Sequence, residues 1–262
     1  MTRTFDDPDM QDDFRGAIDY LKQQRSLNPL PKLQVPPPLP VGSAKLYTMK
    51  VTLLDVSPPI WRRFVAPSFM KLGHLHELLQ VFMGWDDTHA YAFTINGKRF
   101  ASHDRLTVDA ILDKRGSYDA NNYELCQLIK PGMTFNYEYD FENTWDHEIV
   151  VENGAASTDT KYCFYCIEGE RACPPENCGG PEAYEQLLQV LSDPDHPEFD
   201  RRRARVGWDF DSEKFDPKDC NLKLNVRNPT QLASAKVNQA ALNKKKKQER
   251  KRKEAAKKRN RS

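Results

Sequence analysis

The stretch Lys45–Pro67, KLYTMKVTLLDVSPPIWRRFVAP, decides the fold class of this chain. Its first half alternates two sets of residues, Leu46, Thr48, Lys50 and Thr52 against Tyr47, Met49, Val51 and Leu53. This period of two is typical of a β-strand with one buried face. Pro58-Pro59 favours a turn, so Ile60–Pro67 is expected to return as the partner strand of a hairpin.

A helix is predicted directly after the hairpin, in the segment 71–85, KLGHLHELLQVFMGW. One apolar stripe at helical spacing is formed by Leu72, Leu75, Leu79 and Phe82. Gly84 is a favourable residue for the end of the helix. His74 and His76 are assigned to the polar side of this helix and are given no function.

Further strands are predicted on both sides of Asn96-Gly97, in the segments 90–95 and 98–100, because Asn-Gly is a strong hairpin signal. Two more strands are expected at 133–141 and 147–152, joined by ENTWD. A hairpin, a helix laid over it and further strands predict an α+β domain. Its order resembles a β-grasp, with an antiparallel or mixed sheet.

The remainder of the chain is expected to be helical after a cysteine-rich loop. Pro181 suits the first turn of a helix that Asp193-Pro194 ends, and a second helix is predicted over Pro197–Val206. The segment 207–225 is expected to pack along the domain, anchored by Trp208, Phe210 and Phe215.

Three parts are therefore predicted. Residues 1–43 form an N-terminal arm with a Pro-rich linker, residues 44–222 form the folded domain, and residues 223–262 form a disordered basic tail. From Lys236 onward, thirteen Lys and Arg face two acids, a net charge of +11. Because the whole chain carries +1, the preceding residues carry −10. An acidic body and a basic tail would present fields of opposite sign.

Composition places the chain among intracellular globular proteins. Of its 262 residues 39% are hydrophobic, which is enough for one core, and no stretch approaches the roughly 18 apolar residues of a membrane span. The N-terminus is acidic, unlike a secretory signal. We expect a cytoplasmic protein that does not bind a membrane, or a nuclear one if the host is eukaryotic.

Four motifs together resemble the plasmid pRiA4b ORF-3-like family. They are VTLLDVSPPIWRRFVAP, LGHLHELLQVFMGWDDTHAYAF, YEYDFENTWDHEI and CIEGERACPPENCGGPEAYEQLL, in this order. The resemblance covers about residues 45–222 and implies an intracellular α+β domain, found on plasmids, in chromosomes and as a passenger of insertion elements. It implies no catalytic residue. Cys166, Cys173 and Cys178 match family cysteines, whereas Cys163 departs from the pattern.

The cysteines Cys163, Cys166, Cys173 and Cys178 fall within sixteen residues, in the spacing C-x2-C-x6-C-x4-C. In a reducing compartment such clusters more often bind metal than form disulfides. We predict a structural zinc held by Cys166, Cys173 and Cys178, with Cys163 or His147 as the fourth ligand. Two alternatives stay open: buried thiols without metal, and a redox-active Cys-x-x-Cys pair. Cys126 and Cys220 are isolated in sequence and are given no function.

A second cluster combines acids and imidazoles and comes from GWDDTHAYAF and YDFENTWDH. Its members are Asp86, Asp87, His89, Asp140, Asp146 and His147. They could hold a hydrolytic metal or run acid–base chemistry, or they could be ordinary turn residues. In PPIWRR, Trp61 could stack on a base and Arg62 or Arg63 could hold a phosphate. On a strand Trp61 and Arg63 share one face, so a buried Trp61 would leave Arg62 in solvent.

The tail holds the most one-sided charge of the chain. Its candidate nucleic-acid contacts are Lys244, Lys245, Lys246, Lys247, Arg250, Lys251, Arg252 and Lys253. The alternative is a tail that folds back on the acidic body. The predicted function is a zinc-stabilised binding or adaptor module with an unidentified protein partner. The alternative is a metal-dependent hydrolase or nuclease built on His89, Asp140 and His147. Enzyme activity is the less expected class, because phosphate-loop and serine-elbow motifs are missing.

Overall fold

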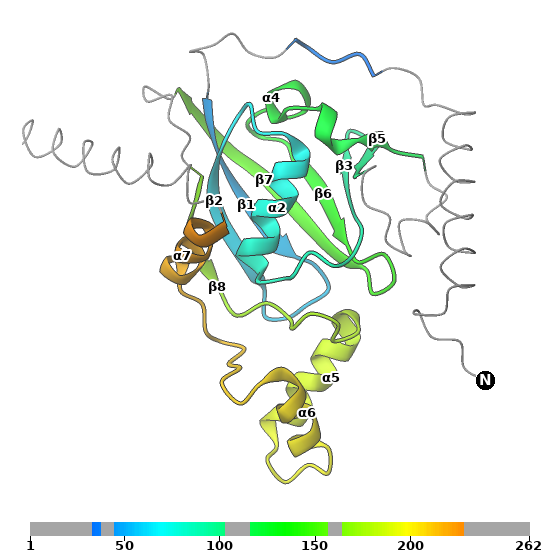
Figure 1. The fold of residues 1–262 in the computed structure, drawn as a ribbon, viewed down its shortest axis with the longest axis vertical. Helices are drawn as coiled ribbons and strands as arrows, with labels where there is room; N and C mark the ends of the chain where they lie inside the picture. Colours follow the sequence, from blue (N-terminus) through cyan, green and yellow to red (C-terminus); the bar gives the residue numbers. More distant parts are fainter. Residues whose placement is uncertain (1–32, 38–44, 103–115, 157–163, 228–262) are drawn as a thin grey trace, which may run out of the picture.

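The structure is a computed structural model and describes residues 33–37, 45–102, 116–156 and 164–227 (Figure 1). Cys163, most of the predicted N-terminal arm and the basic residues from Lys236 onward lie outside the described residues. Within the described ranges, no helix has the length and apolar character needed to cross a membrane.

One eight-stranded mixed sheet organises the fold, in the order β5-β4-β3-β6-β7-β1-β2-β8. Its strands are β1 (Lys45–Leu53), β2 (Ile60–Pro67), β3 (Tyr91–Ile95), β4 (Lys98–Ala101), β5 (Tyr118–Asp119), β6 (Thr134–Tyr139), β7 (Trp145–Ala156) and β8 (Tyr165–Glu170). All neighbouring pairs are antiparallel except β4 and β5, which run parallel. The predicted α+β class is confirmed.

The predicted hairpin supplies the sixth and seventh strands of this sheet. β1 pairs with β2 from Leu46↔Pro67 to Leu53↔Ile60, and its other edge pairs with β7. Tyr47, Met49, Val51 and Leu53 are buried, as their alternation predicted. Because β1 is paired on both edges and buries one face, its pattern carries a strong fold signal.

Helix α2 (Leu72–Met83) covers one face of the sheet (Figure 1). Its predicted stripe of Leu72, Leu75, Leu79 and Phe82 is buried, and Gly84 ends the helix with a left-handed φ of 81°. His76 and Gln80 are buried as well, so the assignment of His76 to the polar side is wrong. The physical reason is that the sheet offers a polar partner, the Tyr137 hydroxyl, to both side chains.

The predicted β3–β4 hairpin turns at Asn96 and Gly97, whose φ angles of 50° and 70° are left-handed. Short elements follow residues 103–115, which the structure does not describe. They are β5, the 3-10 helix η1 (Ala120–Asn122) and α4 (Leu125–Leu128). The two strands predicted around residues 133–152 are β6 and β7, paired from Thr134↔Val150 to Tyr139↔Trp145. Their connecting turn lies at one end of the sheet.

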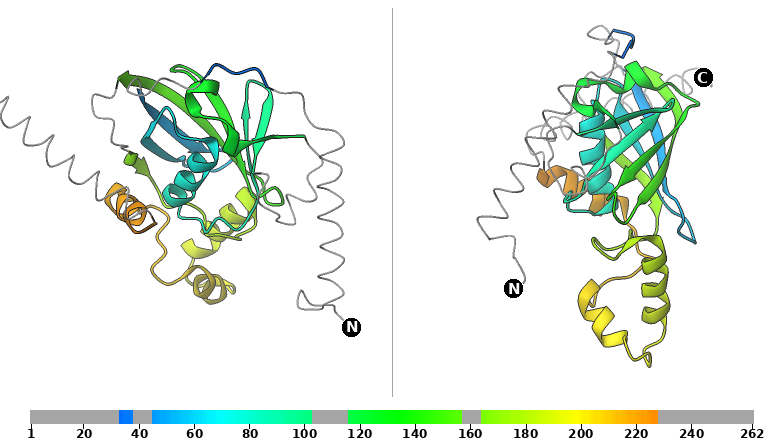
Figure 2. Two further views of the ribbon diagram at one scale, coloured as in Figure 1. Left: turned by 45° about the horizontal axis from the view of Figure 1, so that its top comes forward. Right: turned by 90° about the vertical axis from the view of Figure 1, so that its right-hand side faces the viewer.

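Among the described residues, three helices follow β8: α5 (Gly180–Ser192), α6 (Phe199–Val206) and α7 (Pro217–Arg227). Figure 2 shows α5 and α6 extending beyond one end of the sheet, while α7 packs against β8 and α2. The second half of the segment 207–225 forms α7, a helix that the sequence analysis did not predict. Phe210 and Phe215 pack against the core as predicted, but Trp208 is 66% exposed and anchors nothing.

Candidate functional site

Three loops meet at the end of the sheet from which α5 projects. They are the loop after α2 (residues 84–90), the β6–β7 turn (residues 140–144) and the loop after β8 (residues 171–179). Gly180 brings the start of α5 against this turn: it has a φ of 89°, and a Cβ there would lie 2.7 Å from the Asn143 carbonyl oxygen. The close approach requires glycine and fixes how the third loop meets the second.

Glu176 joins these loops, and sequence reasoning missed it. Its carboxylate accepts hydrogen bonds from the Tyr139 hydroxyl at 2.8 Å and from the Asp86 backbone N–H at 2.9 Å. The Tyr139 hydroxyl also accepts the Thr88 N–H at 3.1 Å. Burial, together with the Glu176 carboxylate, raises the pKa of Tyr139, so its phenol stays a donor at neutral pH.

His89 is the partly exposed imidazole of the site, with 21% of its side chain accessible. Its Nε2 lies 2.9 Å from Asn177 Oδ1 and 3.9 Å from Glu176 Oε1, while its Nδ1 lies 3.6 Å from Asp140 Oδ1. The structure thus brings His89 and Asp140 together, as predicted, and adds Glu176 and Asn177.

Asp140 is buried and holds its own turn. Its Oδ1 accepts the N–H groups of Glu142 and Asn143 at 3.2 and 3.3 Å, and its Oδ2 accepts the Asn143 side-chain amide at 2.7 Å. Its φ of 58° is left-handed, which Asp tolerates when its side chain bonds to the following backbone. Most acceptor positions of this carboxylate are therefore occupied by the turn.

His147 lies in the core and away from this group. Its Nδ1 is 3.2 Å from the Tyr137 carbonyl oxygen, and its ring meets the Trp85 ring edge-on at 5.4 Å. Burial lowers the pKa of His147 to about 4, so the imidazole is neutral at pH 7. The predicted trio of His89, Asp140 and His147 is thus divided between a surface cluster and the core. Asp146 is half-buried on β7.

A second network, centred on the buried His76, was not expected from the sequence. His76 Nε2 is 2.5 Å from Asp87 Oδ1, and its Nδ1 is 2.8 Å from the Tyr137 hydroxyl. Gln80 bonds to the same hydroxyl and accepts the Asp87 backbone N–H. Asp87 has a left-handed φ of 63°, which this network supports. The network ties the loop after α2 to the centre of the sheet.

Arg62 is fully buried, whereas Trp61 lies on the opposite, more accessible face of β2. The structure therefore shows the opposite of the arrangement in which Trp61 is buried and Arg62 lies in solvent. The guanidinium donates to the carbonyl oxygens of Phe82, Trp61, Glu170 and Arg171. Its fifth bond goes to Cys173 Sγ at 3.2 Å, and the Phe215 ring covers it at 3.7 Å. With every donor used inside the fold, Arg62 cannot hold a phosphate. On the other face, Arg63 pairs with Glu152 and Glu168.

The described cysteines occupy different surroundings. Cys173 lies beside Arg62, with its Sγ 3.0 Å from Met83 Sδ, and burial raises its pKa to about 11. Cys166 is buried on β8 and is hydrogen-bonded to Cys220 on α7. That bond, with burial, raises the pKa of Cys166, and it lowers the pKa of Cys220. Cys220, which is isolated in sequence, is brought to β8 by α7.

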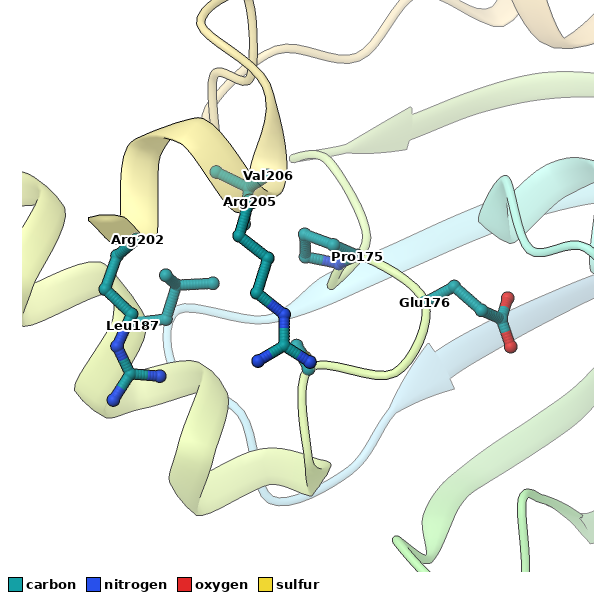
Figure 3. Close-up of a pocket in the computed structure, with 7 residues that line it drawn as sticks. Pro175, Glu176, Leu187, Arg202, Arg205 and Val206 are labelled. Carbon is teal, nitrogen blue, oxygen red and sulfur yellow. The ribbon is translucent and has the colours of Figure 1, made fainter. Parts of the chain in front are cut away.

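Cys178 lines a pocket of about 30 Å³ between α5, α6 and the third loop (Figure 3). Arg202 and Arg205 extend along this pocket from α6, while Glu176 points away from it (Figure 3). Burial raises the pKa of the Cys178 thiol to about 11. The pocket has room for about two water molecules and is far smaller than a site for a nucleotide.

Among the residues that the structure describes, no three His, Cys, Asp or Glu side chains are grouped so that they could hold a metal ion. Cys163 lies outside those residues. The zinc set of Cys163, Cys166, Cys173 and Cys178 therefore stays a prediction, as does the contact of residues 244–253 with nucleic acid.

Comparisons with known proteins agree with the motifs. Residues 45–219 match the family model described as plasmid pRiA4b ORF-3-like protein. The chain belongs to this family. The "Uncharacterized protein y4hQ" of Sinorhizobium fredii (strain NBRC 101917 / NGR234) is 33% identical over 175 residues, which cover 64% of this chain and 85% of that protein.

A solved structure with a similar fold comes from an archaeon. It is the "Protein of Unknown Function MM3350" of Methanosarcina mazei Go1, which is 27% identical with a TM-score of 0.59. The match covers 67% of this chain and 96% of that one. Neither relative's name states an activity, so the function of this pRiA4b ORF-3-like chain has to be argued from its own residues.

Proposed function

We propose that this chain is a binding module of the pRiA4b ORF-3-like family that contacts nucleic acid through its basic tail. The observation that carries the proposal is the charge of residues 243–262, which hold twelve Lys and Arg against two acids. Such a segment attracts a polyanion because each bound phosphate releases condensed counterions. The acidic residues before it make nucleic-acid contact by the rest of the chain unfavourable.

The position of α7 supports a protein in which the tail contacts nucleic acid and the folded domain does not. α7 is the last described helix, and its buried Cys220 and Leu224 pack it against the fold. Sixteen residues separate Arg227 from Lys244, the first of the clustered lysines. A nucleic acid bound by the tail would therefore remain tethered close to the α2 and β8 side of the domain, where a protein partner could act on it.

The candidate site also favours binding over catalysis. Asp140 is occupied by its own turn, and His89 is held by Asn177 with Glu176 nearby. A general base needs a free acceptor aimed at a substrate, and a catalytic metal needs open positions among its ligands. A metal-dependent hydrolase that uses His89 is the second candidate, favoured by the partial exposure of His89.

The test of the main proposal is fluorescence anisotropy with a labelled 20-nucleotide single strand at several salt concentrations. The full chain is expected to bind weakly and without sequence preference. If the tail neutralises about six phosphates, log K should fall with log salt with a slope of about −4. Deletion of residues 243–262 should abolish this binding.

A matched control keeps the length of the tail and changes only its charge. Replacing Lys244, Lys245, Lys246 and Lys247 by Gln should flatten the salt slope, whereas Arg201→Gln on the exposed face of α6 should not change it. Binding that survives the deletion would contradict the proposal and move the contact to the folded domain. Absence of binding at low salt would leave only association of the tail with the acidic body.

A further inference from the structure

Cys166 and Cys220 come from distant parts of the sequence and meet where α7 packs on β8. They are 54 positions apart, and both are buried. Helix α7, which carries Cys220, packs against β8, which carries Cys166. Cys166 Sγ is 3.6 Å from the Glu168 carbonyl oxygen, and Cys220 Sγ is 3.8 Å from that of Phe82.

A second contact fixes the same meeting point independently of the thiols. The Asn221 side chain accepts the Cys166 backbone N–H at 2.8 Å and donates to the Cys166 carbonyl oxygen at 2.9 Å. This paired bond clamps the residue after Cys220 to the backbone of Cys166. Disulfide bonds form only between cysteines whose backbones are held close. The Asn221 clamp holds the backbones of Cys166 and Cys220 close to each other although the two residues are distant in sequence.

We propose that Cys166 and Cys220 are an oxidisable thiol pair, which a hydroperoxide converts into a disulfide that joins α7 to β8. One thiolate attacks the peroxide O–O bond, giving a sulfenic acid and releasing an alcohol or water. The second thiol then attacks the sulfenic sulfur, forming the S–S bond and releasing water. The two thiols lose two electrons in total, and the hydroperoxide gains them.

Access to this pair follows from the place of α7 in the fold. It is the last helix of the described residues, and Leu222 on its outer side is 59% exposed. Helices at the edge of a domain open locally at lower free energy than the central strands, and a small peroxide reaches the thiols during such openings.

The disulfide would enclose residues 166–220, which include the loop 171–179 and helices α5 and α6. It would therefore lock the third loop of the candidate site and the base of the tail to the sheet. A redox signal would act on the whole C-terminal half through one bond. This role is independent of the nucleic-acid contact proposed for the tail.

The experiment uses the full-length reduced chain, treated with excess hydrogen peroxide and then denatured for thiol counting and peptide mapping without reductant. The wild type holds six cysteines, and oxidation is expected to lower the count from six thiols to four. The map should show a peptide joining Cys166 to Cys220. The melting temperature should rise by about 5 °C or more, because the bond constrains a long loop.

Matched variants assign the pair. Cys163→Ser and Cys126→Ser should still lose two thiols, while Cys166→Ser and Cys220→Ser should lose none. The Cys163→Ser result and the wild-type map suffice if either of the last two variants does not fold. A Cys163–Cys166 or Cys173–Cys178 disulfide, oxidation without a disulfide, or stoichiometric zinc bound through Cys166 in the reduced chain would overturn the proposal.

Discussion

Two histidine–carboxylate pairs, His76 with Asp87 and His89 with Asp140, each have one member in the loop after α2. The two pairs differ in burial. His76 is 1% exposed, and both of its ring nitrogens have close partners, Asp87 at 2.5 Å and Tyr137 at 2.8 Å. His89 is 21% exposed and stands 3.6 Å from Asp140. A buried polar network rigidifies a fold when all its members are satisfied, whereas a looser pair at the surface can exchange partners. The comparison separates a structural tether from a position that is open to ligands.

The largest expected effect breaks the tether. His76→Ala should lower the free energy of unfolding by about 3 kcal/mol, because it leaves the Tyr137 hydroxyl and Asp87 without their shared partner and creates a cavity under Tyr91. Urea unfolding measures this loss. His74→Ala is the matched control on the same helix: His74 is exposed, so its removal should have little effect. Equal losses for both variants would contradict the tether.

A third histidine extends the comparison to pH. The folded-state pKa of His147 is lowered by burial from 6.5 to about 4, so between these values the unfolded chain binds a proton that the folded chain does not. Stability should therefore be complete above pH 6.5 and fall as pH drops towards 4, by about 3 kcal/mol in total from this residue.

His147→Gln provides the comparison for this pH effect, because glutamine does not titrate. Unfolding free energies measured from pH 7 to pH 4 should show a shallower decline in the variant than in the wild type. The slopes are compared rather than the absolute stabilities, since the substitution also changes packing around Trp85. Parallel declines in the two proteins would assign the acid sensitivity to other groups.

A smaller effect tests the turn on which the surface pair depends. Asp140→Ala should cost about 1–2 kcal/mol, since it removes the side-chain acceptor of the turn at a left-handed φ of 58°. Asp140→Asn should cost less, because asparagine tolerates this conformation and keeps one acceptor oxygen. Thermal unfolding ranks the two variants. If Asn proved as costly as Ala, the negative charge rather than the turn geometry would be the important property.

The sheet was predictable because β1 alternates without interruption, and Asn96-Gly97 marks a turn that few other dipeptides could form. Arg62 shows where such reasoning stops. Ile60, Arg62 and Phe64 share one face of β2. The apolar residues two positions before and after Arg62 therefore indicated that its face is buried. Burial of the charge nevertheless depends on carbonyl oxygens from distant segments, which local sequence does not reveal.

Helix α7 left a local signal that could have been read. Asp216 accepts the Lys218 N–H at 2.8 Å directly before Pro217, the first residue of the helix, and the buried Cys220 and Leu224 are four residues apart. An N-terminal Asp-Pro and an i, i+4 apolar pair are ordinary helix indicators. Glu176 and Asn177 left no comparable signal, because only the tertiary fold carries their loop to His89.

The smallest expected effect on stability belongs to His89, and it decides what the surface pair is for. His89→Ala removes a bond to Asn177 from a partly exposed side chain and should change the free energy of unfolding by less than about 1 kcal/mol. If the site serves only as a binding surface, calorimetric titration with Mn²⁺ or Mg²⁺ should show no bound ion in the wild type or in the variant. A divalent ion that binds the wild type and is lost in His89→Ala would instead favour the hydrolase alternative. These ions prefer carboxylate and water ligands, and Asp140 and Glu176 are the nearby carboxylates. The near-neutral stability of the variant is what makes this result interpretable, since loss of an ion could then not be attributed to unfolding.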